Sequence, residues 1–170
     1  MKFALLQRTH LALGDGKKMI TNQNYHIAAL KPNMLDTLYA IEQTASPTHW
    51  TETMIADCFA ANYTMYGLYL EDQSLVAYIV LSVIKDEAEI LNLVVETNAR
   101  KQGLGRALLT HAIDALKTQN IKRIFLEVRA SNHAAETLYT QTGFKTMLTR
   151  KAYYRTSDGR EDALLMTINL

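Results

Sequence analysis

The segment between residues 87 and 129 constrains the fold of this chain more than any other stretch. An apolar run, Ile90–Val95, leads into a turn with glycines, and apolar residues at helical spacing then extend to about Thr118. A second apolar run, Ile121–Arg129, follows this helix. Strand, helix and strand in this order predict a βαβ unit with two parallel strands and a right-handed crossover.

The segments on either side of this unit predict the rest of a mixed sheet. Alternating runs separated by turn residues favour an antiparallel meander before the unit, and Asp158–Gly159 is typical of a hairpin turn after it. We therefore expect an α/β or α+β fold. The expected strands are 26–30, 63–70, 75–84, 87–95, 121–129, 144–154 and 163–170. Four helices are expected. One begins at Pro32–Asn33, and the others run from the cap Thr51 to about Ala61, from Gly103 to about Thr118 and from Asn132 to Thr142.

Length and turn composition suggest one main domain. The chain has 170 residues, enough for a single sizeable core, and we assign residues 25–170 to it. Residues 1–24 differ in kind because they contain the breaker cluster Gly14–Lys18, and we treat them as a leader of uncertain structure. Met19 is an alternative natural start, which the sequence alone does not decide.

Charge and cysteine content exclude several classes of function. The formal net charge is +1, so no membrane or direct nucleic-acid partner is expected. Cys58 is the single cysteine, and the five histidines form no zinc pattern, so we expect neither a disulfide nor a metal site. These features favour a cytoplasmic protein.

The glycine turn before the second helix predicts an anion site. A helix N-terminus presents unpaired backbone N–H groups, and glycines at 103 and 105 leave them accessible to a ligand such as pyrophosphate. Two glycines could instead only relax a tight turn, and neither the Rossmann nor the P-loop spacing is present. The candidate cofactor-binding residues are Arg100, Lys101, Gln102, Gly103, Leu104, Gly105 and Arg106.

This Arg/Gln-x-x-Gly-x-Gly spacing resembles the acetyl-CoA motif of the GNAT superfamily of acetyltransferases. Further segments resemble the RimI family of ribosomal-protein alanine N-acetyltransferases: Leu126–Asn132, Leu138–Phe144, Arg150–Tyr154 and Asp158–Ala163. The chain departs from the family pattern at three positions, with Thr97 for proline, Ala152 for asparagine and Arg155 for proline. The resemblance implies the GNAT fold, acetyl-CoA as cosubstrate and an acceptor amine on a protein.

The resemblance also implies roles for individual residues. Glu127 is a carboxylate in a run that otherwise reads as a buried strand, and on physical grounds it could pair with Arg129 or line a cavity. The resemblance makes it the general base and Tyr139 the general acid. Asn132 would cap a helix and contact CoA. The backbone of Leu93, Val94 and Val95 would bind CoA, and Tyr153 and Tyr154 would lie at the acceptor.

The expected activity is acetylation of the N-terminal α-amine of an alanine-starting ribosomal protein of the small subunit, without a metal. Two alternatives stay open. One is a GNAT enzyme that acetylates lysine side chains or a small amine. The other is a non-catalytic acyl-CoA binding module, which would need the glycine turn but neither Glu127 nor Tyr139.

Overall fold

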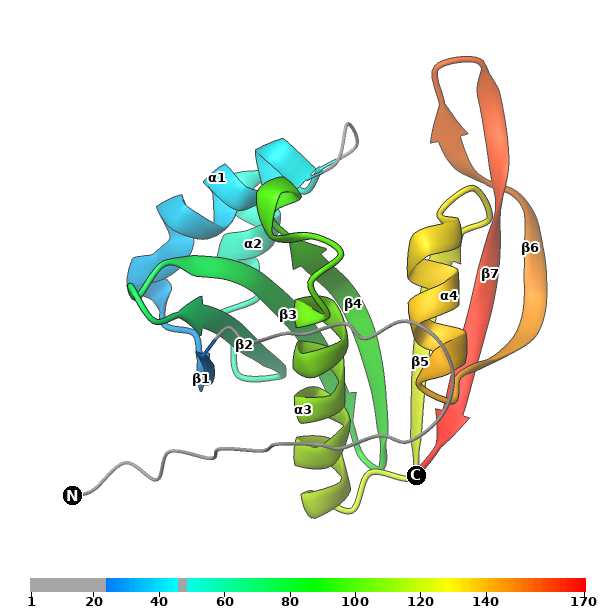
Figure 1. Ribbon diagram of the computed structural model, residues 1–170. Coiled ribbons are helices and arrows are strands. Elements are labelled where there is room, and N and C mark those ends of the chain that lie inside the picture. The colour runs from blue at the N-terminus through cyan, green and yellow to red at the C-terminus, as the bar shows by residue number, and fades with distance from the viewer. Residues whose placement is uncertain (1–23, 46–48) are drawn as a thin grey trace, which may run out of the picture.

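The fold is built on one seven-stranded sheet. The computed structural model describes residues 24–45 and 49–170, so most of the 1–24 leader and the alternative start at Met19 lie outside the described residues (Figure 1). The strand order is β1-β2-β3-β4-β5-β7-β6. The strands are β1 (Tyr25–Ala29), β2 (Tyr63–Leu70), β3 (Leu75–Ile84), β4 (Glu87–Val95), β5 (Arg123–Arg129), β6 (Lys145–Thr156) and β7 (Gly159–Asn169).

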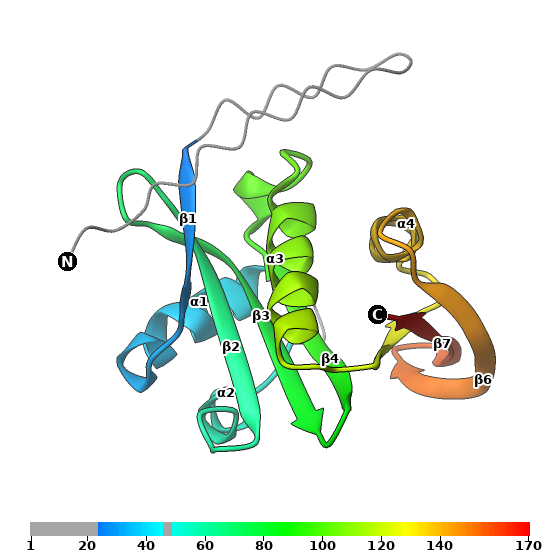
Figure 2. The ribbon, with the colours of Figure 1, turned by 90° about the horizontal axis from the view of Figure 1, so that it is seen from below.

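Helices cover both faces of the sheet. They are α1 (Leu35–Ala45), α2 (Glu52–Asp57), α3 (Leu104–Thr118) and α4 (His133–Gln141), with short 3-10 turns at Pro32–Met34 and Thr97–Ala99. One core cluster includes Leu38 of α1 and Ile55 of α2, and the other includes Leu108 of α3 and Tyr139 of α4. Figure 2 shows α1 and α2 on the opposite side of the sheet from α3.

The predicted topology is confirmed. Strands β1 to β4 pair antiparallel in sequence order, and β4 pairs with β5 in parallel. The C-terminal hairpin is present, and its second strand, β7, lies between β5 and β6. This insertion places β6 at the edge of the sheet, one strand away from β5.

The ends of several elements differ from the expectation. Helix α2 ends at Asp57 rather than near Ala61, because Cys58, Phe59 and Ala60 make tight i→i−3 backbone bonds that lead into the turn before β2. Strands β6 and β7 extend to a two-residue turn before Gly159, and their pairing continues to Thr156↔Gly159. The predicted hairpin residues therefore belong to longer strands than expected.

Local capping signals were predicted correctly. The Thr51 side chain accepts a hydrogen bond from the Met54 N–H at 3.3 Å. The Asn132 side chain accepts one from the Ala135 N–H at 3.2 Å. Both bonds satisfy donors that a helix start leaves without partners, so the two helices begin where their caps require.

A buried carboxylate joins α1 to the middle of the sheet. Glu42 is 3% exposed and accepts hydrogen bonds from the Trp50 N–H at 2.9 Å, from Asn92 Nδ2 at 3.2 Å and from the Tyr78 hydroxyl. Burial, followed by this contact with Glu42, raises the pKa of Tyr78. These bonds compensate the cost of a buried charge and fix α1 against β3 and β4.

Candidate active site

Strands β4 and β5 form a fork. Their parallel pairing runs from Glu87↔Arg123 to Ile90↔Leu126, and the two strands separate beyond that point. Figure 1 shows β4 and β5 diverging towards the end where α3 begins. Backbone N–H and C=O groups of β4 beyond Ile90 therefore lack the β5 ladder, and strand groups without a ladder can bind a ligand.

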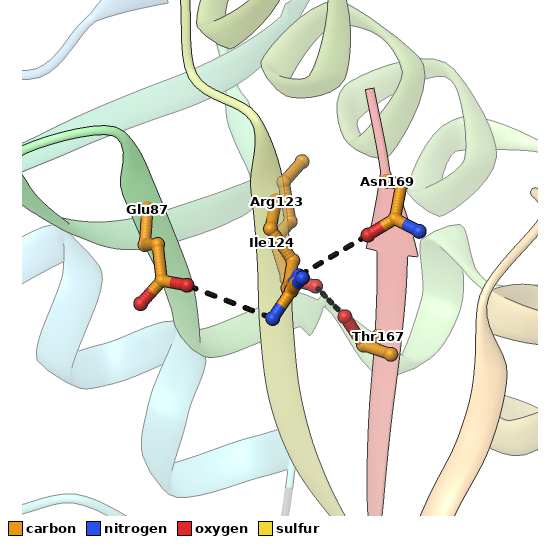
Figure 3. Close-up of polar contacts among 5 residues, drawn as sticks. All are labelled: Glu87, Arg123, Ile124, Thr167 and Asn169. Carbon is orange, nitrogen blue, oxygen red and sulfur yellow. Dashed lines mark hydrogen bonds and ion pairs between the residues drawn. The ribbon is translucent and has the colours of Figure 1, made fainter.

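The other end of the fork is held closed. Arg123 lies between its neighbours, with Nη1 at 3.8 Å from Glu87 Oε1 and Nε donating to Asn169 Oδ1 at 3.1 Å (Figure 3). The Thr167 hydroxyl donates to the Ile124 carbonyl at 3.0 Å. These contacts join β4, β5 and β7, so the separation of the strands is confined to the opposite end.

A bulge in β4 sets which way its last side chains face. The register passes from Leu81↔Ile90 directly to Val80↔Asn92, leaving Leu91 as the extra residue. After the bulge, Leu93 and Val95 pack on the α3 side of the sheet, and Val94 packs on the α1 side. The three side chains thus serve as packing, as expected, and the binding of CoA by their backbone stays a prediction.

The two glycines of the turn have different structural roles. Gly103 is the N-cap of α3 with φ of 82°, a left-handed conformation that disfavours side chains. Gly105 lies in the first turn, where an added Cβ would come 3.3 Å from Val95 Cγ2 and 3.6 Å from Leu138 Cδ2. Gly103 therefore permits the backbone turn, and Gly105 allows α3 to approach the end of β4 and α4 closely.

Polar residues of the turn are engaged within the protein. Arg100 donates to the Val95 carbonyl at 3.1 Å and to the Ala45 carbonyl at 2.7 Å. Gln102 donates to the Asn98 carbonyl at 3.1 Å, and Arg106 donates to Gln141 of α4. Arg100 thus ties the end of β4 to the end of α1. Lys101 is exposed and has φ of 61°. Leu104 is 1% exposed and packs in the core.

Glu127 lies on the face of the sheet opposite α3. Its neighbours Leu126 and Val128 are buried on the α3 side, whereas the Glu127 side chain is 18% exposed on the other face. Its Oε1 lies 2.8 Å from Nη1 of Arg150, a residue of β6. The pair considered from sequence was with Arg129, but Arg129 Nη1 contacts Glu161 Oε1 at 2.5 Å.

Tyr154 of β6 lies close to this carboxylate, whereas Tyr139 of α4 belongs to the core cluster on the α3 side of the sheet. Burial and then the charge of Glu127 raise the pKa of Tyr154, which also lies under the Arg129 guanidinium at 4.3 Å from the ring centre. Tyr139 is 7% exposed, packs edge-on against Phe144 and has a pKa raised by burial and then by Tyr154. Tyr154 therefore lies within electrostatic range of both Glu127 and Tyr139.

A bulge in β6 brings Tyr153 to this surface. The register passes from Arg150↔Ala163 to Tyr154↔Glu161, so three residues of β6 lie opposite Asp162. Asp162 accepts from the Ala152 N–H at 3.0 Å and from Lys151 Nζ at 2.7 Å. Tyr153 is 43% exposed and packs edge-on against Tyr154. The structure thus places both predicted acceptor tyrosines near Glu127.

The sequence analysis missed two charged residues of this surface. Arg150 contacts Glu127 directly. Glu89 of β4 pairs in register with Phe125, two residues before Glu127, and its pKa is raised by partial burial and then by the charge of Glu127, with Arg150 acting in the opposite sense. The sequence pointed to Arg129 because it lies two residues from Glu127 on the same strand, whereas only the strand order β5-β7-β6 brings Arg150 to Glu127.

A surface hollow is also present outside the fork. A hollow of about 360 Å³ lies at the β1 edge, lined by His26, Lys31 and Tyr69 among others, away from the fork. Within residues 24–45 and 49–170, no three His, Cys, Asp or Glu side chains gather in a way that could hold a metal ion. In the same part of the chain, no helix has the length and apolar character needed to span a membrane.

Comparison with known proteins decides the family. A family model described as the acetyltransferase (GNAT) family matches residues 32–144. The chain belongs to the GNAT acetyltransferase family. Among its GNAT relatives, the [ribosomal protein bS18]-alanine N-acetyltransferase of Escherichia coli K12 is 39% identical over 142 residues, which cover 84% of this chain and 95% of the relative. A putative enzyme of the same name from Bacillus subtilis is 33% identical, over 80% and 89% of the two chains.

Solved GNAT structures agree with this assignment. The crystal structure of the Escherichia coli ribosomal-protein-S18-alanine N-acetyltransferase is similar with a TM-score of 0.82 and 38% identity, covering 86% of this chain and 94% of that one. Ard1 from Thermoplasma volcanium has a TM-score of 0.75 and 27% identity, covering 86% and 97%. The GNAT fold expected from the sequence is therefore confirmed, and the protein is an acetyltransferase.

Proposed function

We propose that this protein transfers the acetyl group of acetyl-CoA to the N-terminal α-amine of a protein. The proposed acceptor is an alanine-starting ribosomal protein of the small subunit, as the names of the two bacterial relatives described above suggest. Acetyl-CoA and new ribosomal proteins are both cytoplasmic, so we propose that the protein acts there. The observation that carries the proposal is the Glu127 carboxylate at the β4–β5 fork, beside Tyr153 and Tyr154.

Acetyl-CoA fits the fork and the start of α3. The N-cap Gly103 has no side chain to bond the first N–H groups of α3, and a helix start with such free donors favours phosphate oxygens. Lys101 is exposed beside them and adds positive charge, and Asn132 lies at the start of α4 across the fork. The backbone of Leu93, Val94 and Val95 would hold the pantetheine arm and polarise the thioester carbonyl.

Glu127 is proposed as the general base. It lies on the face opposite α3, so acceptor and CoA would approach the fork from different sides. A peptide α-ammonium loses its proton near pH ~7.7–8.0, so a carboxylate, directly or through one water, needs to supply only modest assistance. The freed amine then attacks the acetyl carbon, a C–N bond forms and the C–S bond breaks.

Tyr139 is proposed to donate a proton towards the leaving sulfur. Burial raises its pKa, so the hydroxyl keeps its proton throughout the working range. A thiol has a pKa of about 8.5, which makes complete transfer from this tyrosine unfavourable. Tyr139 would therefore act mainly by donating a hydrogen bond, and positioning should contribute more to the rate than acid strength.

Mass spectrometry of paired peptides tests the proposed activity. Two basic peptides of one alanine-starting sequence, with a free or a blocked N-terminus, are incubated with the protein and acetyl-CoA. Acetylation of only the free peptide supports the proposal. Acetylation of both indicates lysine side chains. Acetylation of neither, with acetyl-CoA binding shown by calorimetry, favours a small-amine acetyltransferase or a non-catalytic acyl-CoA binding module.

A further inference from the structure

Arg150 contacts the carboxylate that is proposed as the base for the acceptor amine. Its guanidinium comes from β6, crosses β7 and contacts Glu127 on β5 at 2.8 Å. Because β7 lies between β5 and β6, these two strands are about 10 Å apart, and the side chains of Arg150 and Glu127 must both extend across β7 to make contact. Ala163, which pairs with Arg150 in register, is 0% exposed yet carries only a methyl group, so the strand between them leaves room for the arginine.

This ion pair is suited to exchange. The Arg150 side chain is 45% exposed and lies 5.3 Å from the centre of the Tyr153 ring, at the acceptor surface. Ion pairs with a solvent-exposed partner contribute little stability, so a second cation can replace one at small cost. In the neighbouring pair, Arg129 is less exposed than Arg150, at 26%, and its contact with Glu161 joins β5 to β7. Glu127 can therefore exchange Arg150 for an α-ammonium group while this part of the sheet stays fixed.

The displaced guanidinium would lie beside the first carbonyl of a peptide. Arginine is always charged and offers five donors but no acceptor, so it needs an oxygen partner. In a peptide, the carbonyl oxygen of residue one is only a few bonds from the α-amine. The carbon chain next to a lysine ε-amine or a polyamine nitrogen carries no such oxygen.

We propose that Arg150, exchanged from Glu127 by the acceptor ammonium, binds the first carbonyl oxygen of the acceptor and so selects peptide α-amines. This inference rests on the proposed function and assigns Arg150 as a specificity-determining residue. It accounts for a guanidinium placed on the carboxylate that is proposed as the base.

The test compares two acceptors within each variant. One is the free alanine-starting peptide, and the other carries an (E)-alkene in place of its first amide, which removes the carbonyl oxygen but keeps the extended shape. The readout is the ratio of kcat/KM for the two acceptors. This ratio is independent of the fraction of folded enzyme and of any change in the basicity of Glu127, because both affect the two acceptors equally.

The wild-type protein should prefer the amide peptide by about tenfold or more, as expected for a hydrogen bond to a charged donor. In Arg150→Gln the ratio should fall by about tenfold or more from the wild-type value, and Arg150→Lys should retain part of the preference. The alkene also makes the acceptor amine more basic, but this difference is the same for every variant and cancels when the variants are compared. The matched control is Arg123→Gln, which also breaks an arginine–glutamate pair of β5 but at the closed end of the fork. Its ratio should equal that of the wild type.

An unchanged ratio in Arg150→Gln overturns the inference and leaves the proposed function intact. A loss of activity that is equal for both acceptors does the same, because it would assign Arg150 a purely structural role. If the wild-type protein acetylates neither acceptor at its α-amine, the proposed function fails, and the inference fails with it.

Discussion

The backbone N–H of Ala152 donates to Asp162 Oδ1 at 3.0 Å while Ala152 itself adopts a left-handed conformation with φ of 51°. The carboxylate thus holds the β6 bulge at its most unfavourable residue. A left-handed backbone costs an alanine about 1–2 kcal/mol, and asparagine tolerates it better because its side chain bonds locally. Position 152 is also where this chain departs from the asparagine of the RimI family pattern.

Ala152→Asn should therefore stabilise the protein. We expect the free energy of unfolding in urea to rise by about 0.5–1 kcal/mol, within the range of compatible backbone substitutions. The control is Ala134→Asn in the first turn of α4, an exposed position in a regular helix. Asparagine is a weaker helix former than alanine, so this control should be neutral or slightly destabilising. A lower free energy of unfolding in Ala152→Asn than in the wild type would contradict the backbone strain assigned to residue 152.

Removal of the Asp162 carboxylate should loosen the acceptor side alone. Asp162→Ala leaves the Ala152 N–H and the Lys151 ammonium without this acceptor, so the bulge that presents Tyr153 loses its order. We expect the KM for the peptide to rise several-fold, while the Kd for CoA, measured by calorimetry, stays unchanged. Asp158→Ala in the nearby hairpin turn is the control, and weaker CoA binding in Asp162→Ala would argue against separate sites.

Protonation of the Asp162 carboxylate at low pH should have the same effect as the Asp162→Ala substitution. The Lys151 side chain and then the Ala152 N–H lower the pKa of Asp162 from its ordinary value of 3.8. A depressed carboxyl pKa gives stability that is complete above the ordinary value and is lost as pH falls through the folded value. The stability that the Asp162 carboxylate contributes to the folded protein should thus be lost only below pH 3.8. Acid unfolding followed by circular dichroism should show a smaller pH dependence in Asp162→Asn than in the wild type.

The βαβ unit, the meander, the hairpin and the caps at Thr51 and Asn132 could be predicted from the sequence, because each depends on residues that are close to one another along the chain. The glycine turn was also found, since Gly103 is needed for a local conformation. The partner of Glu127 was not found, because its contact with Arg150 depends on β7 lying between β5 and β6. The β4 bulge at Leu91 lacked a signal as well, since no glycine marks it.

Gly103→Ala should weaken CoA binding as well as stability. The residue has φ of 82°, so a side chain costs about 1–2 kcal/mol or shifts the N–H groups at the start of α3. We expect at least a tenfold increase in the Kd for CoA by calorimetry. Gly143→Ala is the matched control, because Gly143 has φ of 102° and lies at the end of α4. This control should lose at least as much stability, because an added Cβ would also come 3.1 Å from Ile168 Cδ1, but it should bind CoA normally. Equal loss of CoA binding in both variants would contradict a CoA site at the start of α3.

The rate of acetyl transfer to the alanine-starting peptide by Glu127→Gln tests the central claim most directly. Glutamine is nearly isosteric but accepts no proton, so we predict a fall in kcat of about 10²–10⁴-fold with an unchanged Kd for CoA. Arg150→Gln breaks the same ion pair from the other side and should retain far more of kcat. A Glu127→Gln variant with wild-type kcat would contradict the account, because the fork would then hold CoA without Glu127 acting as the base.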